Sequence, residues 1–177
     1  YRAIDRWAEL TELVKQKIRD FQHKHPDSTF YFLQLADSFA HQQAPDNLGQ
    51  LFLQNAWGNY FVNKSSTDTS IYFFRNALKV SKTIGEQKII YSQMIKLAGA
   101  YNDIYLSDSA LKYYRMALEF YRKSNDSITM ASVLSGIATA LIESGQNKQA
   151  LEKLYEAEQI FKTSSKLWAT GRFRSQN

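Results

Sequence analysis

The stretch Ala110-Leu-Lys-Tyr-Tyr-Arg-Met-Ala117-Leu118 decides the fold, because its pattern returns at a fixed distance on both sides. Forty residues earlier the chain reads Ser70-Ile-Tyr-Phe-Phe-Arg-Asn-Ala77-Leu78, and forty residues later it reads Ala150-Leu-Glu-Lys-Leu-Tyr-Glu-Ala157. A fixed period of this size is typical of proteins built from stacked repeats. The sequence therefore predicts an array of similar units rather than one irregular domain.

Each repeat is expected to contain two α-helices, since its apolar residues recur every three or four positions. Pro26 and Pro45 are the only prolines, and seven glycines leave few helix breakers elsewhere. Short polar turns separate the helices, so the two helices of a pair must run antiparallel. The pattern predicts eight helices, over residues 2–25, 29–42, 48–63, 69–83, 87–105, 109–123, 127–144 and 148–162.

Small residues also recur at the forty-residue period, where a neighbouring helix must approach closely. On the first helix of each pair they are Gly58, Ala98 and Ala138, and on the second they are Ala77, Ala117 and Ala157. Four aromatic residues are predicted to be core by the same register, namely Phe61, Phe74, Tyr101 and Tyr114. The register explains four others less well, and these either pack between repeats or are exposed: Tyr72, Phe73, Tyr113 and Tyr155.

The repeats resemble the tetratricopeptide repeat (TPR), which has a bulky-small pair and an aromatic on its first helix and a small-aromatic-small series on its second. The matching residues are Trp57-Gly58 with Phe61, Leu97-Ala98 with Tyr101, the series Ala110, Tyr114 and Ala117, and the series Ala150, Leu154 and Ala157. The period is longer than the usual 34 residues and is similar to that of kinesin light chains and Rap-like regulators. The resemblance implies an all-α fold, a right-handed superhelical solenoid of antiparallel helix pairs.

This register divides the chain into five segments. Residues 1–47 match the repeat poorly and are expected to form an N-terminal helical hairpin, either a degenerate repeat or a cap. Three TPR-like repeats should follow at 48–86, 87–126 and 127–163. Residues 164–177 are interpreted as a C-terminal tail or as the start of a truncated further repeat.

Composition limits the classes of partner. The net charge is +5 and the pI is near 9.3, but Lys and Arg are scattered among Asp and Glu, which indicates a solvated surface and disfavours a nucleic-acid partner. No apolar run is long enough for a membrane span. The chain opens at Tyr1 rather than Met, which is compatible with removal of a leader or an upstream domain. Nothing points to a compartment, although a cytoplasmic location is slightly favoured.

Nothing in the sequence favours catalysis. There is no cysteine, and none of the common nucleophile, phosphate-loop, dinucleotide or zinc-helix motifs occurs. His23 and His25 are two apart and would point to different faces of a helix, so with His41 they do not predict a metal site. Glu152 and Glu156 lie at helical spacing among lysines, as on a solvated face. We therefore expect a protein that is not an enzyme and has no metal or cofactor.

In the family that the repeats resemble, the first helices line a concave groove that binds an extended peptide or a partner helix. The lining is mostly amide, hydroxyl and aliphatic, which suits main-chain hydrogen bonds with a few apolar anchors, and Asn59 is the best single candidate. The lysine and arginine clamp of chaperone-tail binders is absent, since Asn55, Ser132 and Gly136 stand at those positions. Transferred by register, the groove residues are Phe52, Asn55, Asn59, Val62, Ser92, Ile95, Gly99, Asn102, Ser132, Ser135, Thr139 and Ile142.

The function predicted from these features is a non-enzymatic scaffold for protein–protein interaction, fitting the regulatory or sensory segment of a larger protein in signal transduction. Binding on the convex face or at the ends remains an alternative to the groove. A second alternative is a nucleic-acid-associated or self-associating helical repeat domain, which would use the basic surface or form a homo-oligomer through the open C-terminal end.

Overall fold

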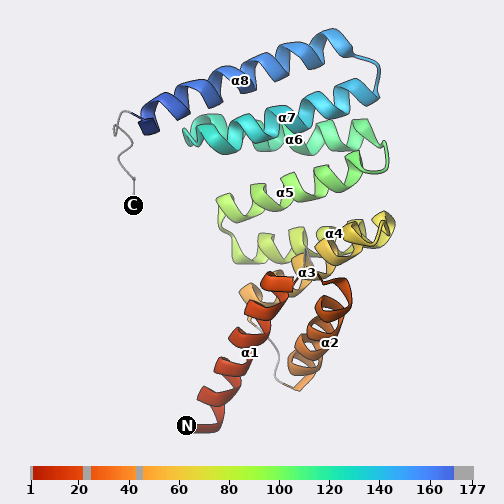
Figure 1. Cartoon of the computed structure of the whole chain (residues 1–177), viewed down its shortest axis with the longest axis vertical. Helices are drawn as coiled ribbons and strands as arrows, with labels where there is room; N and C mark the ends of the chain where they lie inside the picture. Colours follow the sequence, from red (N-terminus) through yellow and green to blue (C-terminus); the bar gives the residue numbers. More distant parts are fainter. Residues whose placement is uncertain (1, 22–24, 43–45, 170–177) are drawn as a thin grey trace. The chain divides into compact units, whose positions relative to one another are not determined.

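The computed structural model describes residues 2–21, 25–42 and 46–169, with side chains described for 12–21, 25–41 and 46–164. These ranges form eight α-helices and contain no strand (Figure 1). The all-α fold predicted from the apolar periodicity is confirmed. The helices are α1 (Arg2–Phe21), α2 (Pro26–Gln42), α3 (Asn47–Asn63), α4 (Thr67–Ile84), α5 (Gln87–Asn102), α6 (Ser107–Lys123), α7 (Ser127–Glu143) and α8 (Asn147–Ala169).

Several helix ends differ from the sequence expectation. α2 begins at Pro26 instead of residue 29, because the fixed φ of proline suits the first turn of a helix, where no N–H donor is needed. α5 ends at Asn102 instead of residue 105, since Tyr105 adopts a left-handed φ of 59° that no helix tolerates. α8 continues to Ala169, seven residues past the expected end at Lys162, because no proline or glycine interrupts it.

The forty-residue period is present in the backbone of the turns as well as in the side chains. Ser65, Tyr105 and Gly145 each follow the first helix of a pair, and their φ angles of 55°, 59° and 76° are all left-handed. The next residue in each turn donates its N–H to the carbonyl five residues back, at 2.9, 3.0 and 2.8 Å. This is the Schellman type of helix ending, which needs one left-handed residue. The turn therefore repeats even though glycine occupies only one of the three positions.

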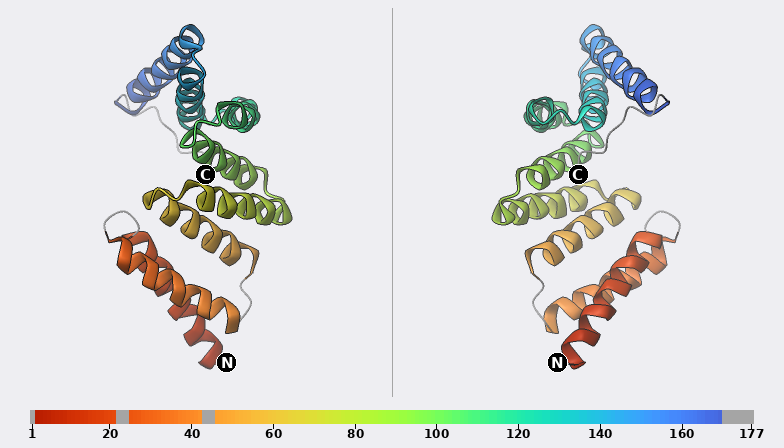
Figure 2. Two further views of the ribbon diagram at one scale, coloured as in Figure 1. Left: turned by 90° about the vertical axis from the view of Figure 1, so that its right-hand side faces the viewer. Right: turned by 90° about the vertical axis from the view of Figure 1, so that its left-hand side faces the viewer.

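The chain divides into two compact units, residues 1–93 and 94–177, and each is described by itself. In the first unit α1 packs on α2, α2 on α3, and α3 on α4; in the second, α6 packs on α7 and α7 on α8. The hairpin partners α3 and α4 run side by side, as do α7 and α8 (Figures 1 and 2). The core of the first three helices consists of Val14, Ile18, Leu33, Ala36 and Ala56, with larger half-buried side chains around it.

The small residues lie where the register placed them. The five alanines of the two series are at most 2% exposed, and Gly58 is also buried. Among the aromatics predicted to be core, Phe74, Tyr101 and Tyr114 are buried, but Phe61 is only half-buried and that prediction was wrong. Phe61 remains open because it stacks beside Trp57 and Phe73, which are half-buried themselves.

Two glycines are held against buried rings. A Cβ built on Gly58 would lie 2.6 Å from the ring of Phe74, and one built on Gly136 would lie 2.5 Å from the ring of Tyr114. Such distances are far below carbon–carbon contact, so only glycine lets each ring reach its position. The two rings stand forty residues apart, but the glycines do not: Gly58 on α3 precedes its ring, and Gly136 on α7 follows its ring.

Candidate peptide-binding site

One face of α7 is polar and open, while the opposite face is core. Ser132 and Thr139 are exposed, Ser135 is half-buried, and Ile142 is 52% exposed. Their spacing of three and four residues places them on one side of the helix. The other side consists of residues that are at most 3% exposed, namely Val133, Leu134, Ile137, Ala138 and Leu141.

The hydroxyl groups of this face are arranged to accept hydrogen bonds. Ser135 Oγ donates to the carbonyl of Ala131 at 3.1 Å, and Thr139 Oγ1 donates to the carbonyl of Ser135 at 3.2 Å. With their hydrogens directed to the helix backbone, the oxygens keep lone pairs for an incoming N–H. The face can therefore receive main-chain N–H groups of a ligand, with Ile142 as an apolar contact.

Three of the residues assigned to the groove lie on α5 within the second unit. Ile95 and Gly99 are half-buried, and Asn102 is 7% exposed. Asn102 Nδ2 donates to the carbonyl of Gly136 at 3.1 Å and so ties α5 to α7. Its Oδ1 is buried and has no partner in the described part of the chain. Asn102 therefore serves the packing of the two helices through its nitrogen.

Tyr114 lies directly behind this face. Its ring contacts Gly136, and its hydroxyl oxygen is 3.6 Å from a Cβ built on Gly99. Burial, together with the charges of Asp103 and Glu143, raises the pKa of Tyr114 to about 12. The phenol is therefore neutral across the physiological range and adds no charge to the face.

In the first unit the assigned residues have different surroundings. Phe52 packs against the core of the first three helices, and the cations of Lys15 and Arg19 lie 5.9 and 5.8 Å from its ring centroid. Asn59 is half-buried, and its amide forms no hydrogen bond within the part of the chain that the structure describes. Val62 is 36% exposed.

The two remaining residues of the first unit bond to their own helices. Asn55 Nδ2 donates to the carbonyl of Leu51 at 3.0 Å, and Ser92 Oγ donates to that of Ile89 at 2.8 Å. Side chains of α1 therefore lie over Phe52, and Asn59, farther along α3, is a half-buried amide that can donate and accept.

The role of Asp37 was not predicted from the sequence. Its Oδ2 accepts a hydrogen bond of 2.9 Å from Trp57 Nε1, joining α2 to α3, and burial raises the pKa of its carboxyl group. The available signal was chemical: a half-buried tryptophan needs an acceptor for its N–H. Because α2 matches the repeat poorly, no register placed an acceptor there.

Chemistry of other kinds finds no support in the described residues. Among the described side chains, at 12–21, 25–41 and 46–164, no group of three His, Asp or Glu residues could hold a metal ion. His25 lies edge-on to Phe21, and His41 Nδ1 is 2.7 Å from the carbonyl of Asp37; His23 lies outside these ranges. In the same part of the chain, no helix combines the length and apolarity that a membrane span requires.

Comparison with known proteins identifies the fold. No family model matches the sequence, and neither does any curated protein. The TPR-like repeats of a Podospora anserina protein described as a kinesin light chain match with a TM-score of 0.64 and 14% identity, over 93% of this chain and 91% of that one. BtubC (BKLC) from P. vanneervenii matches with a TM-score of 0.50 and 14% identity, over 99% and 94%. The chain thus has a TPR-like helical repeat fold.

Proposed function

We propose that this chain is a non-enzymatic scaffold for protein–protein interaction, which binds an extended peptide or a partner helix along the first helices of its repeats. The observation that supports the proposal most strongly is the face of α7 formed by Ser132, Ser135, Thr139 and Ile142. A helix whose other side is fully buried presents here hydroxyl oxygens and the aliphatic side chain of Ile142, and Ile128, one turn before Ser132, is also exposed. Repeat arrays of this kind use such extended surfaces for binding.

The chemistry of the face favours a neutral, extended segment. Its hydroxyl oxygens can accept from peptide N–H groups, and Ile142 offers an apolar contact of the size of one side chain. No charged side chain belongs to the set Ser132, Ser135, Thr139 and Ile142, so recognition by a lysine or arginine clamp is not part of the proposal. In the first unit, the amide of Asn59 on α3, which has no hydrogen bond within the described part of the chain, is suited to the same main-chain recognition.

The rival functions have weaker support. An enzyme needs convergent titratable groups, and none gathers on this face. A nucleic-acid-binding surface needs clustered free cations, whereas Lys123 and Lys162 each form an ion pair with a glutamate, and Arg122 and Lys153 both contact Glu156. Binding of an oligonucleotide that weakens steeply as salt rises would favour the nucleic-acid alternative.

Selection from a phage-displayed library of random dodecapeptides tests the proposal. Peptides enriched on the wild-type chain should bind the double variant Ser135→Arg, Thr139→Arg at least about tenfold more weakly, because two long cations cover the acceptor oxygens. The matched control is Met116→Arg, Tyr155→Arg, which makes the same change at exposed positions on α6 and α8. Circular dichroism confirms that both variants are folded.

The control should change the affinity by less than about twofold. If the selected peptides lose affinity for the control variant and keep it for the α7 variant, binding lies on the second helices and the proposal fails.

A further inference from the structure

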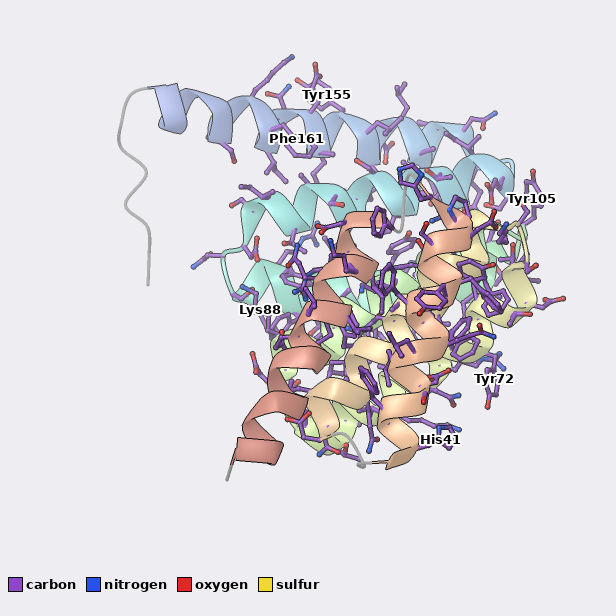
Figure 3. The ribbon with its side chains drawn as sticks, turned by 60° about the horizontal axis from the view of Figure 1, so that its bottom comes forward. His41, Tyr72, Lys88, Tyr105, Tyr155 and Phe161 are labelled. Atoms are coloured by element: carbon purple, nitrogen blue, oxygen red, sulfur yellow. The ribbon has the colours of Figure 1, made fainter. Side chains whose placement is uncertain are left out.

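Six aromatic rings from α2, α3 and α4 form a continuous surface within the first unit, which we name the aromatic band. Neighbouring ring centroids are 5.3 to 5.9 Å apart. None of the rings is buried: Phe30 is 38% exposed, Tyr72 is 62% exposed, and the other four are half-buried. Figure 3 shows Tyr72 projecting from the outside of the ribbon. The band consists of Phe30, Trp57, Tyr60, Phe61, Tyr72 and Phe73.

Three of these rings form a flat floor. Trp57, Phe61 and Phe73 are mutually near-parallel, with interplanar angles of 9° to 21° and centroid separations of 5.6 to 5.9 Å. A column of three rings would hold its outer members about 7 Å apart, twice the carbon–carbon contact distance. Since all three centroid separations are shorter than this, the rings do not form a column. Instead, they are displaced sideways from one another. Together they form a group of near-parallel rings that is larger than one ring.

Two further rings make a wall at one end of this floor. Phe30 and Tyr60 stand at 80° and 89° to Trp57, with centroids 5.8 and 5.9 Å from it. The Trp57 end of the band is therefore a corner between parallel and perpendicular rings. Such a corner offers ring faces and ring edges to one ligand group.

The other repeats show that packing alone does not require these rings. The residues forty positions after Trp57 and Phe61 are Leu97 and Tyr101, both buried, and those eighty positions after are Ile137 and Leu141, also buried. Tyr60 corresponds to Ala100 and Ala140, again buried. Only the first unit has large rings left open to solvent at these positions, and open aromatic clusters are typical of interaction surfaces.

A carboxylate lies at the corner. Asp37 Oδ2 accepts the Trp57 indole N–H at 2.9 Å, while Oδ1 has no partner within the described part of the chain. Asp37 is half-buried, so an opposite charge placed beside it is screened less than at an open surface. The group therefore combines one fixed oxygen with one oxygen that remains free to accept a hydrogen bond.

The ion pair beside the band involves Asp27 and not Asp37. Lys64 Nζ lies 5.9 Å from the Tyr60 centroid and 3.9 Å from Asp27 Oδ1, so that its charge is offset by Asp27. The same contact shows that a ring of the band already has a cation beside its face.

We propose that the corner formed by Trp57, Phe30, Tyr60 and Asp37 binds an arginine side chain of a partner peptide. A guanidinium is flat and stacks on aromatic faces, and its N–H groups lie in its own plane, where they can reach Oδ1 beyond the edge of the indole. Lysine lacks the flat face. This site lies on the side of α3 opposite Asn55 and Asn59, and it does not rest on the proposed face of α7.

A nucleic-acid base could also stack on the floor, but its phosphates would then approach Asp37 and Asp27, which disfavours it. The two classes of ligand are separated in the same experiment by titrating a short oligothymidine in parallel. The full chain is used throughout, and all titrations are made at one pH.

The test follows the indole N–H resonance of Trp57 by NMR in a chain with Trp7→Phe and Trp168→Phe, which leaves one indole. The probes are acetyl-Gly-Arg-Gly-amide and the same peptide with lysine or with citrulline, the neutral isostere of arginine. We expect a saturable shift with arginine, a weaker one with lysine, and none with citrulline. Asp37→Asn should weaken arginine binding about tenfold, whereas Asp108→Asn on α6, a matched loss of charge, should not.

The comparison of peptides uses one protein, so it stays decisive even if Asp37→Asn unfolds the chain. Equal shifts with arginine and citrulline, or unchanged affinity in a folded Asp37→Asn variant, would overturn the proposal. So would a Trp57 shift produced by oligothymidine and not by the arginine peptide, because the rings would then be a base-stacking platform.

Discussion

Replacing Gly136 with alanine is expected to destabilise the chain by about 2 kcal/mol. The new Cβ would lie 2.5 Å from the ring of Tyr114, which is buried and cannot move aside without displacing its neighbours. Alanine forms helices better than glycine by about 1 kcal/mol, so the helix propensity alone would stabilise the variant. The clash with the fixed ring should cost more than this gain. Urea unfolding followed by circular dichroism measures the difference.

Gly99→Ala is the matched control, because it makes the same substitution in a helix that faces the same ring. Its Cβ would meet only the hydroxyl oxygen of Tyr114, at an ordinary contact distance of 3.6 Å. With no clash, the helix propensity should prevail and stabilise the chain by about 0.5 to 1 kcal/mol. Equal effects of the two substitutions would show that the fit between glycine and ring does not govern this packing.

Stability should fall between pH 10 and pH 12 because of Tyr114. Burial and the nearby charges of Asp103 and Glu143 raise its pKa from 10.0 to about 12 in the folded chain. The folded state then holds the phenolic proton more tightly than the unfolded state does. The stability is therefore fully present below pH 10 and is lost as pH rises towards the folded pKa, by about 2 kcal/mol in all.

The variant Tyr114→Phe isolates this contribution, since it keeps the ring and removes the titrating group. Other groups, including Tyr121, whose pKa burial and Asp126 also raise, titrate in both proteins. Urea unfolding at several pH values should show a steeper alkaline loss of stability in the wild type than in the variant. Identical slopes would mean that the Tyr114 phenol is as accessible in the folded chain as in the unfolded one.

Much of the fold could be predicted because residues of the same type recur at equivalent positions of several repeats. Ala77, Ala117 and Ala157 identify one another as small positions, and their burial follows from the helix period alone. The left-handed φ of Tyr105 could not be read in this way, since glycine marks the same turn only at Gly145. The local hydrogen bond from the Leu106 N–H to the Tyr101 carbonyl, which closes the helix, accompanies that conformation in a residue type that does not favour it.

The candidate site was predictable to a smaller extent. Ser132, Ser135 and Thr139 share an accessible side of α7, as the helical spacing implies. The environments of Phe52 and Asn102 depend on contacts with α1 and α7, which a single helix period does not contain. The Asp37–Trp57 contact lies where the repeat is degenerate, so no second copy pointed to it.

The central claim is that binding takes place on the first helices of the repeats, and chemical-shift mapping tests it most directly. A peptide selected on the wild-type chain is added to the ¹⁵N-labelled protein, and the amide shifts are assigned to residues. We predict that the largest shifts occur at Ser132, Ser135, Thr139 and Ile142 of α7. Shifts confined to the exposed residues of α6 and α8, with those of α7 unchanged, would contradict the claim.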